Sequence, residues 1–213
     1  MSKVHMEKIA CVACGKESPQ RIWDMIDPMF NKDTKEKVIS GELFTFTCPH
    51  CGFQRRITYD TVYQEIDKGR TFHLVTSEDS YMQAVNLYAD RDAHSGTVLT
   101  HEIVRIVLSQ NQLAEKIRIF DEGLDDRIVE MLKAMYLQEL QRQCPDIQVD
   151  ETLFYVTEDG KYEIAFLCRD GNHRSIQFTR EMYDGIFGDI AHRLPPINQE
   201  IEVDMEIAME YLR

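Results

Sequence analysis

Four cysteines occur as two closely spaced pairs, Cys11 with Cys14 and Cys48 with Cys51, and 33 residues separate the pairs. Two residues between cysteines form a tight knuckle whose sulfurs can share one ion, and two knuckles complete a tetrahedral set of four thiolates. Gly15 and Gly52 follow the pairs directly. Glycine suits this position because the chain turns sharply there, often at positive φ. The pattern therefore predicts one metal site with the ligands Cys11, Cys14, Cys48 and Cys51.

Zinc is the predicted ion, with iron as the alternative. Four thiolates around one ion are typical of structural zinc sites, but tetrahedral geometry does not separate zinc from iron. The two knuckles are also similar to the knuckle pair of rubredoxins, which favours an iron site used for electron transfer. Two independent redox pairs would need thioredoxin-like surroundings, which neither pair has. A catalytic zinc needs an open coordination position, which four thiolates do not leave.

Charge and hydropathy limit the function classes. The formal net charge is −13, divided into +1 for residues 1–77 and −14 for residues 78–213. An acidic surface repels phosphate backbones, so the charge disfavours nucleic-acid binding outside the first part. No apolar run is long enough to cross a bilayer, and Cys11 comes too early for a signal peptide to precede it. We therefore expect a cytoplasmic protein without a membrane segment.

The first part of the chain predicts short strands around the knuckles. Alternating polar and apolar residues or β-rich runs predict strands over residues 21–27, 43–47, 53–59 and 71–76. A short helix is expected from Asp33, ending at Gly41, and a marginal helix over residues 80–90.

The remaining chain predicts helices and a β-meander. After a strand over 97–108, helices are expected over 111–120 and from Asp125 to about Arg142. Three antiparallel strands follow over 152–157, 162–168 and 175–178, because Asp-Gly pairs between apolar runs favour hairpin turns. Thr179 and Asp204 are expected to cap two further helices. The predicted class is α+β, with a zinc-ribbon or rubredoxin-like domain at 1–77, a linker or marginal helix at 78–96, and an acidic α+β domain at 97–213.

Several stretches around the cysteines resemble one bacterial family. Ile9 to Gly15, Trp23 with Asp24, residues 40–43, and Phe46 to Phe53 resemble the CpXC family, named for its paired C-P-x-C motifs. The resemblance covers about residues 9–78, and residues 111–132 look like the region that follows in longer members. Val12 stands where the first motif would have proline. The resemblance implies a zinc-ribbon-like domain in a bacterial cytosolic protein and supplies no activity.

Other residue groups have structural interpretations. The acidic stretch 121–126 does not match the EF-hand spacing and predicts a corner between two helices. Cys168 with His173, Cys144 alone, and His101 with Glu102 match no catalytic motif. His5 and His50 lie near the knuckles but beside a complete ligand set. Arg55 and Arg56 are a weak basic patch for nucleic acid.

The sequence therefore favours a binding or scaffold protein over an enzyme. No catalytic residues are predicted. The expected partners are proteins that meet the acidic part, while rubredoxin-like electron transfer and nucleic-acid binding by the ribbon are the alternatives.

Overall fold

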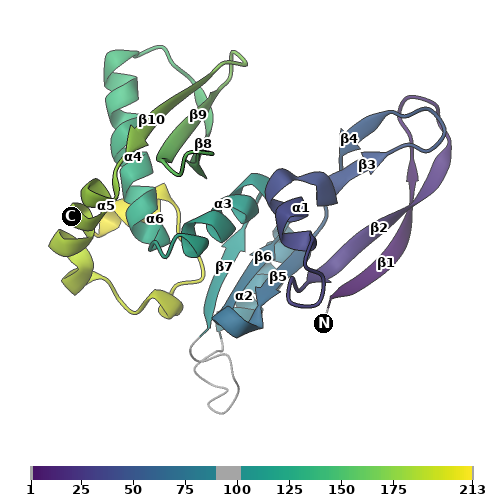
Figure 1. The fold of residues 1–213 in the computed structure, drawn as a ribbon, viewed down its shortest axis with the longest axis horizontal. Helices are drawn as coiled ribbons and strands as arrows, with labels where there is room; N and C mark the ends of the chain where they lie inside the picture. Colours follow the sequence, from purple (N-terminus) through teal and green to yellow (C-terminus); the bar gives the residue numbers. More distant parts are fainter. Residues whose placement is uncertain (1, 90–101, 213) are drawn as a thin grey trace. The chain divides into compact units, whose positions relative to one another are not determined.

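The computed structural model describes residues 2–89 and 102–212, and it divides into two compact units, Met1–Ala114 and Glu115–Arg213. The described residues form helices and strands in both units (Figure 1), which confirms the α+β class. Within them, no helix is both long and apolar enough to cross a membrane.

The first unit is built on a mixed five-stranded sheet with the strand order β1-β2-β5-β6-β7. Neighbours β1 with β2 and β5 with β6 are antiparallel, whereas β2 with β5 and β6 with β7 are parallel. The strands are β1 (Lys3–Ala10), β2 (Glu17–Ile26), β5 (Thr61–Glu65), β6 (Arg70–Leu74) and β7 (Ile103–Val107). The helices are α1 (Thr34–Ser40), which ends at Gly41 with φ of 78°, and α2 (Glu78–Ala89).

Two hairpins carry the cysteine pairs. Strand β2 pairs with β1 along its length but joins β5 only at Met25 and Ile26, so β1 and β2 form a two-stranded arm that extends beyond the sheet (Figure 1). The arm turns at the first cysteine pair. The second pair lies in the turn of a shorter hairpin, β3 (Thr45–Thr47) with β4 (Gln54–Arg56). Both knuckles are therefore held by antiparallel strands on either side.

The second unit packs helices against a three-stranded meander with the order β10-β9-β8. The strands are β8 (Val149–Val156), β9 (Tyr162–Cys168) and β10 (His173–Phe178), and the helices are α4 (Asp126–Gln143), α5 (Arg180–Ile190) and α6 (Met205–Glu210). The core joins apolar side chains of α4 to those of the meander, such as Phe154, Ile164 and Phe166. Helix α3 (Gln110–Asp121) runs across the division between the units, and single 3-10 turns lie at Glu42–Phe44, Ile66–Lys68, Ala191–Arg193 and Ile197–Gln199.

Charged side chains are also buried in this second unit. Lys116 lies 2.9 Å from Asp126 and 3.1 Å from Glu130, and Lys133 lies 2.9 Å from Glu130 and 3.0 Å from Glu115. All five residues are at most 4% exposed. We call these five residues the buried charge network. Ion pairs in such surroundings are favourable only when every member keeps its partners.

Most predicted elements are confirmed within one to four residues, but two strands were missed. The meander, both long helices and the caps Asp125, Thr179 and Asp204 are present, each cap accepting a backbone N–H. Strands β1 and β5 were not predicted. The predicted strand 97–108 is observed as β7 from Ile103, and residues 97–101 lie outside the described residues.

The observed division also differs from the predicted one. We expected a second domain from residue 97, yet the units divide between Ala114 and Glu115. The physical reason is that β7 pairs in parallel with β6 along all five residues, from Arg70 with Ile103 to Leu74 with Val107. The strand expected to open the second domain therefore completes the sheet of the first.

Candidate metal centre

The two knuckles have the same backbone geometry. In the first, the N–H of Gly15 donates to the carbonyl of Cys11 at 2.8 Å; in the second, the N–H of Gly52 donates to the carbonyl of Cys48 at 2.9 Å. Gly15 and Gly52 have φ of 70° and 74°. A side chain is disfavoured in this left-handed region, which explains the glycine behind each pair.

The four sulfurs gather at one point although they come from two separate hairpins. Their Sγ atoms all lie within 4.8 Å of one another, and two of the cross-hairpin distances are 3.6 Å for Cys11 with Cys51 and 3.7 Å for Cys14 with Cys48. With metal–sulfur bonds of about 2.3 Å, the edge of a tetrahedral site is about 3.8 Å. A disulfide would need about 2.05 Å. The arrangement therefore fits four ligands of one ion rather than two crosslinks.

Cys11 and Cys48 are also part of a small core. They are 2% and 1% exposed, and they pack with Ile22, Phe46 and Ile57. Cys14 and Cys51 are exposed. The first cysteine of each knuckle thus packs in the small core, whereas the second cysteine lies on the solvent side of the cluster.

The thiols do not ionise equally without a cation. Desolvation acts to raise the pKa of Cys11, but N–H donors of Cys14 and Ala13 and the neighbouring thiols lower it to about 7. At Cys51 the N–H of Phe53 acts to lower the pKa, but desolvation and the other three sulfurs raise it to about 12. Thiolates this close repel one another. A divalent cation removes that penalty, so metal binding and loss of the thiol protons are coupled.

The family comparison agrees with this site. A model of the CpXC family, described as CpXC protein, matches residues 9–133. The chain belongs to the CpXC family. The matched region contains all four cysteines and extends through α3 into the first part of α4. Comparisons with curated proteins and with solved structures gave no significant match.

The departure from the CpXC pattern at Val12 is compatible with the knuckle. Val12 is 70% exposed and lies in the turn between two ligands. It takes no part in the sulfur cluster, so the missing proline changes the stiffness of the turn and leaves the ligand set intact.

The other candidate residues are not brought to this cluster. The group of possible metal ligands among the described residues contains neither His5 nor His50. The Nδ1 atom of His5 lies 2.9 Å from Asp24, and His50 is exposed. Arg56 donates to Asn111 at 3.2 Å, and Tyr59 packs its ring against Phe44. Phe53, Arg55 and Arg56 are exposed, whereas Tyr59 is partly buried.

The acidic stretch 121–126 forms the predicted helix corner. Gly123 has φ of 65°, and Asp125 accepts the N–H of Arg127 as the N-cap of α4. Asp126 is fully buried beside Lys116 and belongs to the buried charge network. Sequence reasoning missed that network, because Lys and Glu on a helix are usually solvent-facing and their periodicity shows only which faces are charged.

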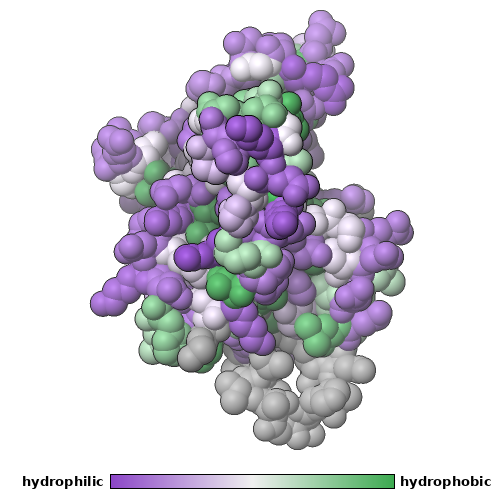
Figure 2. Space-filling view, turned by 90° about the vertical axis from the view of Figure 1, so that its right-hand side faces the viewer, coloured by the Kyte–Doolittle hydropathy of each residue, from purple (hydrophilic) through white to green (hydrophobic). Residues whose placement is uncertain are grey.

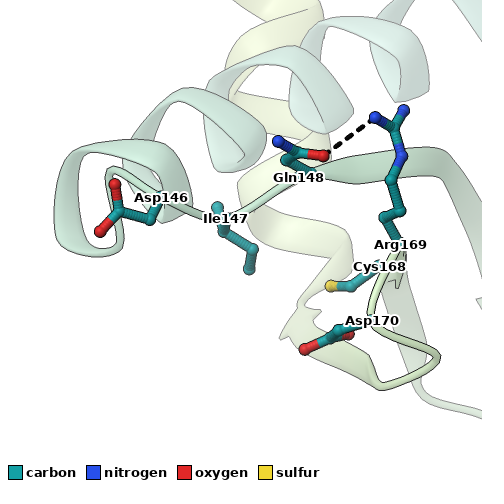
Figure 3. Close-up of a pocket in the computed structure, with 6 residues that line it drawn as sticks. All are labelled: Asp146, Ile147, Gln148, Cys168, Arg169 and Asp170. Carbon is teal, nitrogen blue, oxygen red and sulfur yellow. Dashed lines mark hydrogen bonds between the residues drawn. The ribbon is translucent and has the colours of Figure 1, made fainter.

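A hollow of about 310 Å³ in the second unit is lined by Asp146–Gln148 and Cys168–Asp170. In Figure 3 the Cys168 thiol and the Ile147 side chain lie between these two segments. Arg169 is bound to Asp150 at 2.8 Å and to Gln148 at 2.9 Å.

Cys168 donates to the carbonyl of Phe166, and His173 is exposed on β10. These residues do not form a nucleophile with a base and an orienting group. His101 lies outside the described residues, whereas Glu102 is buried and accepts from Gln64.

Proposed function

We propose that Cys11, Cys14, Cys48 and Cys51 bind one structural zinc ion, and that the chain is a binding or scaffold protein of the bacterial cytosol. The observation that supports this proposal is that the four sulfurs, which come from two hairpins, all lie within 4.8 Å of one another. Four thiolates saturate a tetrahedral ion and leave no position for water or substrate. Such a site supports the fold around it instead of performing chemistry.

The need for a metal follows from the size of the core that surrounds it. Two of the five buried members of the small core are themselves ligands, Cys11 and Cys48. A core this small contributes little hydrophobic free energy, and structures that bury so few side chains depend on a metal or a crosslink. The ion would thus stabilise the arm and the β3–β4 hairpin, and any partner would bind surfaces that these elements position.

A protein is the partner that the charges favour. Residues 78–213 have a net charge of −14. Electrostatic complementarity favours a basic protein surface and disfavours a phosphate backbone. The packing of Tyr59 against Phe44 within the first unit also weakens the nucleic-acid alternative.

Metal analysis of the purified full chain tests the proposal. We expect a colourless protein with one zinc per chain, and a Cys48→Ser variant that loses the metal. Cys144→Ser is the matched control, because Cys144 is a free cysteine outside the cluster. A red protein that contains iron would replace this proposal with rubredoxin-like electron transfer. Full zinc content in Cys48→Ser would refute the four-cysteine ligand set.

Partner capture tests the second half of the proposal. The full chain and its Cys48→Ser variant would be used as baits in cytosol from the source organism. We expect a protein captured by the native chain, eluted by salt, and lost or weakened with the variant. Capture that depends on nucleic acid, and is abolished by nuclease, would refute the protein-partner proposal.

A further inference from the structure

The outer edge of the five-stranded sheet is a long and open strand. Strand β1 has eight residues, and within the described part of the chain it pairs only with β2. Seven of the eight residues are exposed, the exception being Ile9, which packs near the small core. In Figure 1, β1 lies at the outer side of the arm. An edge of this length presents unpaired N–H and C=O groups that can pair with another strand.

The surface chemistry on this side favours strand pairing over docking of a broad apolar face. Figure 2 looks at the side where β1 to β4 lie in Figure 1, and it shows mostly hydrophilic residues with separate hydrophobic groups. Val4 and Met6 of β1 are 48% and 61% exposed. Two apolar side chains are too few for a hydrophobic interface but enough to support a ladder of backbone hydrogen bonds.

Few registers are open to two copies of β1. The residues of an antiparallel pair either both direct their N–H and C=O groups at the neighbour or both direct them away. When two identical strands pair in this way, one residue must therefore lie opposite the same residue of the second copy. The register changes between Lys3, which pairs with Met25, and Val4, which pairs with Trp23. Asp24 is the extra residue between these two pairs, so the bulge lies in β2 and β1 itself is regular. Registers centred on Glu7 or Lys8 place identical charges opposite each other, which is unfavourable.

The register centred on His5 is self-complementary in charge and hydropathy. It places Lys3 opposite Glu7 of the second copy, and Glu7 opposite the second copy's Lys3. On the other face it places Val4 opposite Met6, and Met6 opposite Val4, so four apolar side chains meet. Centring on Met6 instead would oppose Lys3 to Ile9 and Val4 to Lys8, which pairs charges with apolar groups.

We propose that two copies of this chain associate by antiparallel pairing of β1 with β1, in the register centred on His5. The pairing would join two five-stranded sheets into one continuous sheet and cover both open edges. It rests on the proposed metal site only insofar as that site holds the arm in place.

Charge reversal at Lys3 and Glu7 tests the register in the full chain. Sedimentation velocity over a concentration series should show a monomer–dimer equilibrium. Lys3→Glu places two glutamates opposite each other at two symmetric positions, and Glu7→Lys does the same with two lysines. We expect each single variant to weaken association by roughly ten- to a hundred-fold, and the double variant to restore it.

Lys8→Glu is the matched control. It makes the same charge change on the same strand, but in the register centred on His5 this position lies opposite Ser2, which carries no charge. It should leave association within about threefold of the native chain, as expected for a position without a charged neighbour across the interface. A chain that stays monomeric up to its highest soluble concentration would overturn the proposal. So would a dimer whose affinity in both single variants equals that of the native chain, or a double variant that associates no better than either single variant.

Metal content measured on the same samples separates this proposal from the preceding one. A zinc-loaded monomer refutes the pairing and leaves the metal site standing. A metal-free dimer that follows the charge-reversal pattern supports the pairing and refutes the zinc site.

Discussion

Replacement of Lys133 by methionine should destabilise the second unit severely, although it removes only one charge. The Lys133 ammonium lies 3.0 Å from Glu115 and 2.9 Å from Glu130, and its side chain is 5% exposed. Methionine keeps much of the volume but leaves two buried carboxylates without this cation. The network of two lysines and three carboxylates then changes from a formal charge of −1 to −2. Removing one partner of a buried pair costs about 3–5 kcal/mol.

The pair Glu139 and Arg142 on the same helix provides a matched control. Its spacing of three residues equals that of Glu130 and Lys133, and its distance of 2.7 Å is as short. The difference is exposure, because the Arg142 side chain is 73% exposed and that of Glu139 is 43% exposed. Exposed pairs contribute little to stability. We therefore expect Arg142→Met to leave the unfolding midpoint of the second unit unchanged.

Hydrogen exchange in α4 over a urea series measures the effect in the full chain. With a urea dependence of about 1.5 kcal/mol/M, a loss of 3–5 kcal/mol lowers the midpoint by about 2–3 M. Fluorescence of Trp23, the single tryptophan, follows the first unit separately. Adding Glu115→Gln to Lys133→Met should recover part of the loss, because it returns the network to −1. Equal midpoints for Lys133→Met and Arg142→Met would refute the argument.

Two further predictions concern stability, one for the carboxylate of Glu65 and one for the glycines Gly52 and Gly185. Burial acts to raise the pKa of Glu65, but Arg70, Lys35 and Lys68 hold it below its usual value. The ionised form of Glu65 therefore stabilises the first unit above about pH 4.3, and this contribution is lost as pH falls through the folded pKa. In urea unfolding followed by Trp23 fluorescence, Glu65→Gln should be less stable than the native chain at neutral pH and should approach it in acid; a constant difference would contradict the assignment. Gly52→Ala and Gly185→Ala both place a methyl group in open space, yet Gly52 has φ of 74° and Gly185 lies inside α5 with no positive φ. In thermal unfolding, the first should lose about 1–2 kcal/mol and the second gain about 0.5–1 kcal/mol, and a loss at both positions would refute the conformational explanation.

The cluster of four cysteines could be predicted because its information is local. Each knuckle is encoded by two cysteines and the glycine that follows them, and the same pattern occurs twice. The helix ends at Asp125, Thr179 and Asp204 were likewise predictable, because a side chain caps its own helix within three residues. Periodicity also located the meander, since one face of each strand is directed at the core.

The missed features depend on contacts between distant residues. Strand β1 carries Lys3, Glu7 and Lys8 and is exposed on both faces, so it lacks the alternation of a half-buried strand. Pairing of β7 with β6 joins residues more than thirty positions apart, and no local signal shows which sheet a strand enters. The burial of Lys116 and Lys133 depends on the fold as a whole.

The position of the second knuckle within the connection from β2 to β5 has a consequence for synthesis on the ribosome. Cys14 is made 37 residues before Cys51. At about 5–20 residues per second, the first cysteine pair leaves the ribosome about 2–7 seconds before the last ligand does. During that interval the nascent chain offers two sulfurs instead of four. A metal ion acquired early is then held by half of its ligands, and the second hairpin captures it only when translation has passed the end of the site.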